Sequence, residues 1–234
     1  MPPLASRLAL KVELRGQVIR PAAWLPLLPA TRLEPDGGLR LDGDCFEARI
    51  SADRREGWVR GPLERFPIEA VVRVLLGDSL LRRGGLLVHG VALADQGRAA
   101  LFTGASGAGK STLGWWGRAG GLQLLSDELV GVLPEQTGFS VWATPWNAST
   151  AGRASLKQIG ILAHAPFAQL SPIAPSEVLR VLLPNVLEPA ASPQVRSSLF
   201  QIASRLLAVV PAVRLAFAPN VGVASVLSQA LAAS

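Results

Sequence analysis

The sequence predicts an α/β protein whose main domain is built around a phosphate-binding loop. Three observations lead to this prediction: a glycine-rich motif at residues 104–111, an apolar strand pattern directly before it, and a helical pattern directly after it. Strands mixed with helices around such a loop are typical of α/β domains. We expect a small β-rich region at residues 1–62 packed on the core, and a main domain at residues 63–234 with a helical C-terminal part.

The composition indicates an ordinary folded protein. Of its 234 residues, 49% are hydrophobic and only 17% are charged, which suits a sizeable core and argues against disorder. No apolar stretch reaches the roughly 20 residues that a membrane-spanning helix needs. Residues 1–7 lack the basic-then-apolar pattern of a signal peptide. We therefore expect a cytoplasmic protein without a membrane partner.

The charge and the cysteine content exclude further classes. The net charge is +6, yet no basic run is longer than two residues, as at Arg54-Arg55 and Arg82-Arg83. Nucleic-acid-binding proteins gather their basic residues in patches or stripes, so we expect no nucleic-acid partner. The single Cys45 cannot form an internal disulfide, and we expect it to be a buried structural thiol.

The N-terminal region shows strand patterns followed by one helix. Residues 8–14 alternate between apolar and mostly polar side chains, as residues 46–50 do, and this period of two predicts half-buried strands. Gly37-Gly38 and Asp42-Gly43 supply turn signals between them. A helical spacing of apolar residues then predicts a helix over Pro67–Leu81.

The rest of the chain alternates between strands and helices. Gly120-Gly121 ends the helix that follows the glycine-rich motif, and Ser192 is a suitable N-cap before Pro193. The expected strands are Leu86–Leu93, Arg98–Thr103, Leu122–Leu125, Leu129–Leu133, Ser140–Ala143, Ser155–Ala163 and Val213–Phe217. The expected helices are Lys110–Arg118, Pro175–Leu187, Pro193–Val209 and a terminal helix from Val221.

The motif Gly-Ala-Ser-Gly-Ala-Gly-Lys-Ser matches the P-loop pattern Gly-x-x-x-x-Gly-Lys-Ser. Its glycines let backbone N–H groups curl closely around phosphate oxygens, and the next helix turns its positive end to the anion. Lys110 is expected to reach the β- and γ-phosphates, while the Ser111 hydroxyl ligates Mg²⁺. We therefore expect ATP and Mg²⁺ as cofactors. The expected nucleotide site is Gly104, Ala105, Ser106, Gly107, Ala108, Gly109, Lys110, Ser111 and Thr112.

An acidic pair, Asp127-Glu128, follows the next apolar strand. One carboxylate there can hold Mg²⁺, and a second can take a proton from a nucleophile. We expect this strand to lie directly beside the strand that leads into the P-loop, so that the acids face the phosphates. Residues 84–133 should then form three adjacent strands, with the loop and the acids at one edge and the side chains of Lys110 and Glu128 converging on one cavity.

Two other features leave alternatives open. His89 lies in an apolar strand, where a core histidine and an active-site histidine both fit. Trp115-Trp116 in the P-loop helix suit core or interface anchors as well as a platform for a base. His164 is interpreted as structural.

Together these residues show a family resemblance. The stretch His89-Gly90-Val91, the P-loop and the acidic pair resemble the C-terminal catalytic domain of HPr kinase/phosphorylase, a P-loop fold related to phosphoenolpyruvate carboxykinase. The short interval between Lys110 and the acids distinguishes this family from most other P-loop ATPases. The firm resemblance covers residues 84–133. Beyond it, the chain looks like the short HPr-kinase-like proteins often found in bacterial biosynthetic clusters.

The resemblance implies a role for each matched residue. Lys110 and Ser111 match the nucleotide and Mg²⁺ residues, Asp127 matches the first acid, and His89 matches an active-site histidine. Glu128 matches the residue that deprotonates the substrate serine, where the family has Asp. The later Glu-Ile-Arg-Gly motif of the family is not found; Pro145-Trp146-Asn147 and Arg153 fall in that region.

Three functions are compatible with these residues. The first is a kinase that transfers the γ-phosphoryl group of ATP to a serine hydroxyl of a protein or peptide. The second is a nucleotide-binding scaffold or switch without transfer activity, and the third is a small-molecule kinase or plain ATPase. The spacing of His89, Lys110 and Glu128 favours the first. Formation of a homo-oligomer stays open.

Overall fold

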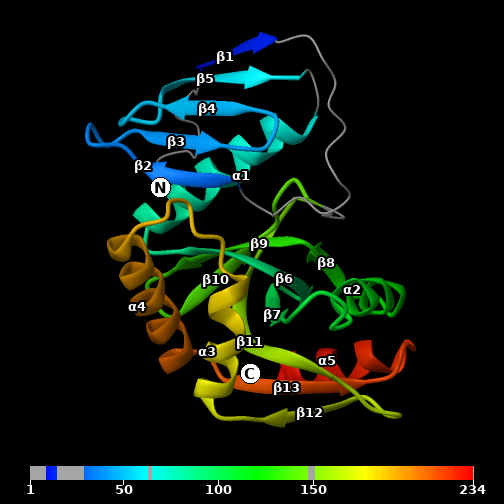
Figure 1. Cartoon of the computed structure of the whole chain (residues 1–234). Helices are drawn as coiled ribbons and strands as arrows, with labels where there is room; N and C mark the ends of the chain where they lie inside the picture. The colour runs from blue at the N-terminus through cyan, green and yellow to red at the C-terminus, as the bar shows by residue number, and fades with distance from the viewer. Residues whose placement is uncertain (1–8, 15–28, 63–64, 147–150, 234) are drawn as a thin grey trace. The chain divides into compact units, whose positions relative to one another are not determined.

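The structure, a computed structural model, describes residues 9–14, 29–62, 65–146 and 151–233 (Figure 1). The chain divides into two compact units. Unit 1 comprises Met1–Ser79 and Glu188–Ser197, and unit 2 comprises Leu80–Leu187 and Ser198–Ser234. The expected division into residues 1–62 and 63–234 stays a prediction.

Unit 1 contains a five-stranded sheet in the order β1-β5-β4-β3-β2. The four strands β2 to β5 form an antiparallel meander, and β1 joins β5 in parallel. The sheet is followed by helix α1. The elements are β1 (Ala9–Leu14), β2 (Ala30–Leu33), β3 (Leu39–Asp42), β4 (Glu47–Ile50), β5 (Glu56–Gly61) and α1 (Arg65–Arg82).

One face of this sheet packs against α1. Leu39 and Leu41 on β3 are buried and alternate with half-buried residues, as the two-residue period of a strand requires. Both join a buried cluster with Val71 and Val74 of α1. Cys45 lies at the border of this cluster and is half-buried, so the expected buried thiol is only partly enclosed.

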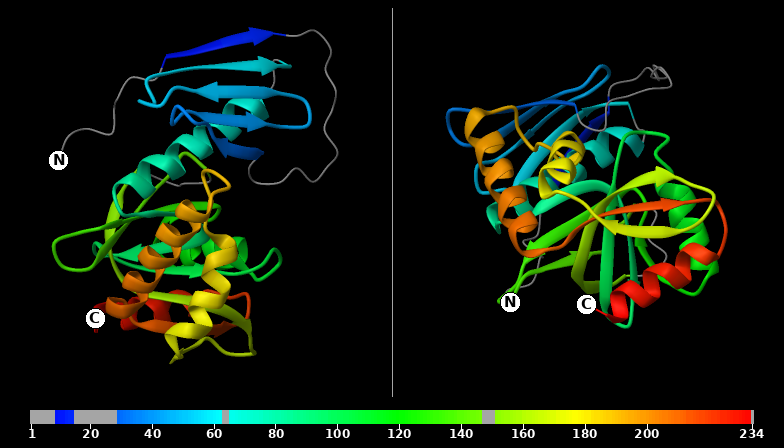
Figure 2. Two further views of the ribbon diagram at one scale, coloured as in Figure 1. Left: turned by 60° about the vertical axis from the view of Figure 1, so that its left-hand side comes forward. Right: turned by 90° about the horizontal axis from the view of Figure 1, so that it is seen from below.

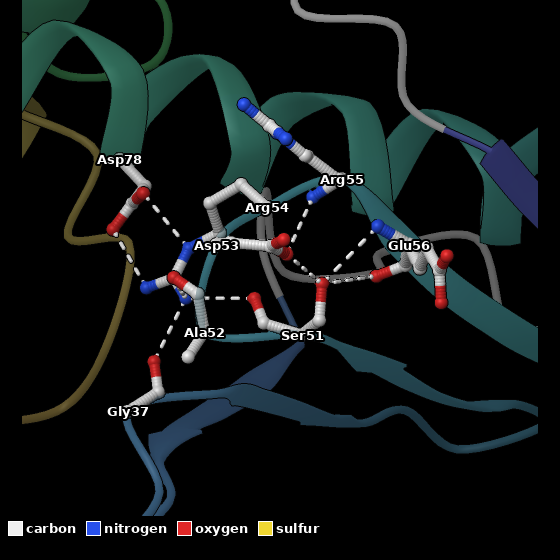
Figure 3. A network of polar contacts seen from close by, with 8 residues as sticks. All are labelled: Gly37, Ser51, Ala52, Asp53, Arg54, Arg55, Glu56 and Asp78. Atoms are coloured by element: carbon white, nitrogen blue, oxygen red, sulfur yellow. Dashed lines mark hydrogen bonds and ion pairs between the residues drawn. The ribbon is translucent and has the colours of Figure 1, made fainter.

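A polar network ties the β4–β5 turn to α1 (Figure 3). Arg54 has a left-handed backbone with φ of 62°, which aims its side chain back over the turn. Its guanidinium forms an ion pair with Asp78 at 3.0 Å and donates to the Gly37 carbonyl at 2.8 Å. The side chains of Arg54 and Asp78 are each only 12% exposed. The two charges are thus held out of solvent and compensate each other.

Unit 2 is a mixed α/β assembly around an eight-stranded sheet. The strand order is β10-β9-β6-β7-β11-β13-β12, with β8 paired to β6. The strands are β6 (Leu86–Asp95), β7 (Arg98–Thr103), β8 (Gln123–Ser126), β9 (Leu129–Pro134), β10 (Phe139–Trp142), β11 (Arg153–His164), β12 (Gln169–Pro172) and β13 (Ala212–Phe217). The helices are α2 (Lys110–Ala119), α3 (Pro175–Leu182), the short 3-10 helix η1 (Leu183–Asn185), α4 (Pro193–Val209, of which residues 193–197 belong to unit 1) and α5 (Gly222–Ala232).

An extra pairing of β10 with β11 closes a ring of five strands, β6-β7-β11-β10-β9. Helices α2 and α5 lie side by side against one face of the sheet (Figure 2). Helix α2 lies close to β6 because Gly117 faces Leu93, and close to α5 because Gly120 faces Ala224; a β-carbon at either position would collide with its neighbour. Gly117 thus allows α2 to pack closely on β6, the strand that precedes β7 in the chain.

Two sequence predictions are wrong. Strand β8 does not lie directly beside β7, because β6 lies between them and residues 86–134 form four strands rather than three. The helix expected over Pro175–Leu187 ends at Leu182, since Pro184 lacks the N–H group needed to continue it. Among the described residues, no helix is long and apolar enough to cross a membrane.

Candidate functional site

The glycine-rich loop connects β7 directly to α2, so the expected order of strand, loop and helix is present. Gly107 and Gly109 have φ of 81° and 98°, a left-handed conformation that side chains with a β-carbon rarely adopt. No side chain caps the N-terminus of α2 at Gly109. The positive end of the helix dipole therefore faces the loop, which suits an anion.

Lys110 opens α2 and is only 7% exposed. Its ammonium group donates to the carbonyl oxygens of Gly104 at 2.8 Å and Ala105 at 3.0 Å, so the side chain folds back under its own loop. Burial lowers the pKa of Lys110 below its ordinary value. Phosphate oxygens brought to this nitrogen would favour its charged form.

The peptide group between His89 and Gly90 links the loop to the acidic pair. Its carbonyl oxygen accepts a hydrogen bond from Thr103 Oγ1 at 2.9 Å, and Thr103 is the last residue before the loop. Its N–H group donates to the carbonyl oxygen of Glu128 at 3.1 Å. Because a peptide group is planar and rigid, this one group sets the spacing between the start of the loop and the Glu128 backbone.

Asp127 lies against the second turn of α2. A β-carbon built on Gly114 would lie 3.1 Å from Asp127 Cβ and 3.6 Å from Asp127 Oδ2, so the glycine makes room for this side chain. Asp127 Oδ1 is buried and has no hydrogen-bond partner. Ser111, which is exposed, precedes Gly114 by about one helical turn.

These residues fit a magnesium ion. A buried carboxylate oxygen without a donor is unusual in folded proteins and suits a cation ligand. Protein sites for Mg²⁺ commonly use one or two carboxylates together with phosphate oxygens and water. Asp127 and Ser111 could supply such a partial set, with phosphate oxygens and water completing it. The described residues contain no cluster of three or more His, Cys, Asp or Glu side chains that could hold a metal by themselves.

His89 lies on the same face of the sheet as α2. Along β6, His89 shares this face with Val91 and Leu93, because successive side chains of a strand point to opposite faces. Val91 and Leu93 are buried in the same cluster as Leu113 of α2. His89 itself is half-buried rather than fully enclosed in the core. This position is compatible with a role beside the loop, which stays a prediction.

The tryptophan pair on α2 is split between core and surface. Trp116 packs against the core cluster, whereas Trp115 is 62% exposed, and the two rings meet edge to face at 4.4 Å. A stacking role for Trp115 stays open. His164 is exposed at the end of β11. Arg153 lies over the ring of Trp142, with its guanidinium carbon 5.4 Å from the ring centroid.

Buried hydroxyl groups around the acidic pair were not predicted from the sequence. Thr103, Ser126 and Thr144 are all buried, and each donates a hydrogen bond to a backbone carbonyl near the loop or the acids. Each stands at or just beyond the end of an apolar strand. In the sequence, such a hydroxyl group can be recognised as a polar residue at the end of an apolar strand. The sequence does not identify the carbonyl group to which it donates.

No protein family matches the sequence, and no curated protein matches it. Among solved structures, the chain is distantly similar to the Hpr(Ser) kinase/phosphatase from Coxiella burnetii, with 11% sequence identity and a TM-score of 0.34. The match covers 63% of this chain and 94% of that chain. It is a distant structural similarity only.

Proposed function

We propose that the protein is an ATP-dependent kinase of the HPr-kinase type, which transfers the γ-phosphoryl group to a serine hydroxyl of a protein or peptide. The observation that carries the proposal is the His89–Gly90 peptide group, hydrogen-bonded to Thr103 on one side and to Glu128 on the other. It ties the phosphate-binding loop and a carboxylate residue to one rigid unit. A kinase needs this arrangement, because phosphoryl transfer depends mainly on positioning and electrostatic stabilisation.

The loop and Lys110 bind the triphosphate in this proposal. The N–H groups at the start of α2 and the Lys110 ammonium face the phosphate oxygens, so Lys110 exchanges its two carbonyl partners for them. Ser111 and Asp127, whose Oδ1 is buried without a hydrogen-bond partner, would hold Mg²⁺, and the ion would neutralise charge on the phosphate oxygens.

Glu128 acts as the general base. The substrate hydroxyl gives its proton to the Glu128 carboxylate while its oxygen forms a bond to the γ-phosphorus. The bond between the γ-phosphorus and the bridging oxygen breaks, and ADP leaves with the electron pair. His89 supports the phosphate or the acid from the α2 face of the sheet.

The test uses Mg-ATP and serine-containing peptides, with mass spectrometry to detect one added phosphate. Glu128→Gln should keep nucleotide binding and lose transfer by about 10²–10⁴-fold, the usual contribution of a general base. Glu128→Asp is the matched variant: it keeps the base, and because related kinases have Asp, activity should be preserved or raised. Transfer by Glu128→Gln at the wild-type rate would refute the base assignment.

The same assay separates the alternatives. Release of inorganic phosphate without a modified peptide would indicate a plain ATPase. Formation of ADP with neither free phosphate nor a modified peptide would indicate a small-molecule kinase. Stabilisation by Mg-ATP without any turnover would indicate a nucleotide-binding scaffold or switch.

A further inference from the structure

The acidic pair is held on its outer side by a segment that the proposed mechanism does not use. Ser126, at the end of β8, is fully buried. Its hydroxyl donates to the carbonyl oxygen of Trp146 at 2.8 Å and accepts from the N–H group of Glu128 at 3.3 Å. One side chain thus joins the Glu128 backbone to the segment after β10.

A second hydroxyl group, on Thr144, holds the segment after β10 by a hydrogen bond to the chain just after the acidic pair. Thr144 is buried, and its Oγ1 donates to the carbonyl oxygen of Leu129 at 2.5 Å. Strand β10 ends where Trp142 pairs with Gly131, and Thr144 follows two residues later beside Leu129. Residues 144–146 therefore form a strap along the acidic pair, fixed at both ends by a hydroxyl group.

The backbone of Glu128 is consequently fixed from two directions. Its carbonyl oxygen accepts from Gly90 N on the β6 side, and its N–H group donates to Ser126 on the strap side. We propose that Ser126 is a positioning residue for the base Glu128, acting through the Glu128 peptide nitrogen; this inference rests on the proposed function. A displacement of about 1 Å at a reacting group can lower a rate by about 10²-fold.

The test compares Ser126→Ala with a matched control, Ser140→Ala. Ser140 is also buried, at 3% exposed, and its hydroxyl also makes two hydrogen bonds, to Glu135 at 2.7 Å and from Trp142 at 2.9 Å. Those partners lie on β10 and at the end of β9, not at the loop or the acids. Each variant loses one buried hydroxyl group with two hydrogen bonds, so a general loss of stability affects both alike.

Ser126→Ala should lower kcat for peptide phosphorylation by about 10- to 100-fold while KM for Mg-ATP changes by less than about threefold. Ser140→Ala should leave kcat within about threefold of the wild type. Thr144→Val, which removes the other hydroxyl of the strap at nearly constant volume, should also lower kcat. It keeps the test decisive should Ser126→Ala fail to fold.

Amide hydrogen exchange gives a readout independent of activity. Peptides covering residues 126–130 and 143–146 should exchange faster in Ser126→Ala than in the wild type, and at the wild-type rate in Ser140→Ala. Equal kcat for Ser126→Ala and the wild type overturns this inference alone, even where exchange is faster. No transfer by the wild type overturns the proposed function, and this inference falls with it.

Discussion

Replacing Asp127 by asparagine separates a metal-binding role of this residue from a structural one. Asp127 Oδ1 is buried and without a hydrogen-bond partner, while the residue contacts Gly114 on α2. A buried acceptor left unsatisfied costs about 1–3 kcal/mol, and more when it is charged. The neutral amide carries a smaller penalty at almost the same volume. We therefore expect Asp127→Asn to stabilise the nucleotide-free protein by about 1 kcal/mol.

The expected gain is measurable by thermal unfolding. For a chain of this size, 1 kcal/mol corresponds to roughly 2–4 °C in Tm. Tryptophan fluorescence is a suitable probe, since Trp115, Trp116, Trp142 and Trp146 all belong to unit 2, which also contains Asp127. Saturating Mg-ATP at about 100 times its Kd should stabilise the wild type by about 2.7 kcal/mol. In Asp127→Asn, the part of this stabilisation that depends on Mg²⁺ should be largely lost.

Two results would refute this reasoning. A drop in Tm of the nucleotide-free variant would mean that the carboxylate has a structural partner. An unchanged dependence of the Tm shift on Mg²⁺ concentration would mean that another residue holds the ion. Asp127→Ala is the control, because it removes the unsatisfied oxygen altogether and should repeat the loss of Mg²⁺ dependence.

Three further predictions concern the loop, the helix behind it and unit 1. Lys110→Met should abolish the Tm shift with Mg-ATP. Because burial lowers the Lys110 pKa below its ordinary value of 10.5, the unfolded chain binds more protons than the folded one just below pH 10.5, and the stability of the wild type rises with pH there. Urea midpoints should show that the variant lacks this rise. Gly114→Ala puts a β-carbon 3.1 Å from Asp127 Cβ and should displace this side chain. Calorimetry in the presence of ATP should then find Mg²⁺ binding weakened several-fold. Unchanged binding would mean that helix α2 shifts and Asp127 keeps its position. Arg54→Ala removes the partly buried ion pair with Asp78 and should destabilise the protein by about 3 kcal/mol in urea unfolding; a loss below about 1 kcal/mol would show that this ion pair adds little to stability.

Local patterns predicted most elements of unit 2. The strands from Leu86 to Thr103 and the helix from Lys110 are bounded by glycines and filled with apolar residues, so length and composition settle their type. Strands β2, β3, β5 and β12 were not predicted individually, because they are short, lie at or near sheet edges and carry many polar side chains. Their stability comes from pairing with distant segments, which a local pattern does not contain.

Strand order was the wrong part of the fold prediction, and its physical cause is a hairpin. Gln96 and Gly97 both have positive φ, 47° and 77°, which makes the connection between β6 and β7 a two-residue turn of the I′ kind. Such a turn forces β6 and β7 to pair, and β11 takes the other side of β7. No edge of β7 is left for β8. The Gln96-Gly97 pair can be read in the sequence. The sequence does not show that this hairpin prevails over the direct pairing of β7 with β8 that their connection through α2 suggests.

The residue types of the candidate site can be read from the sequence, whereas the contacts that support them cannot. The glycine-rich loop and Lys110 follow from a motif in which each residue type has one physical task, and the acids follow from their position after an apolar strand. The hydrogen bonds of the Thr103 and Ser126 hydroxyl groups depend on tertiary contacts between segments 14 to 20 residues apart. Such contacts are fixed by the sheet, so they emerged only with the structure.

The unexpected strand order serves the proposed chemistry better than the expected one. Strand β6 is antiparallel to both β7 and β8, so β7 and β8 run in the same direction and end at the same edge of the sheet. With neighbouring strands about 4.8 Å apart, one intervening strand separates the backbones of Thr103 and Glu128 by about 10 Å. A glutamate side chain spans nearly half of that distance, and the remainder accommodates a hydroxyl group in hydrogen-bond reach of the carboxylate and about 3 Å from a phosphorus atom. Direct pairing of β8 with β7 would halve this separation and bring the carboxylate closer to the proposed phosphate position. The hairpin that keeps β8 from β7 therefore leaves room for the acceptor of the proposed transfer reaction.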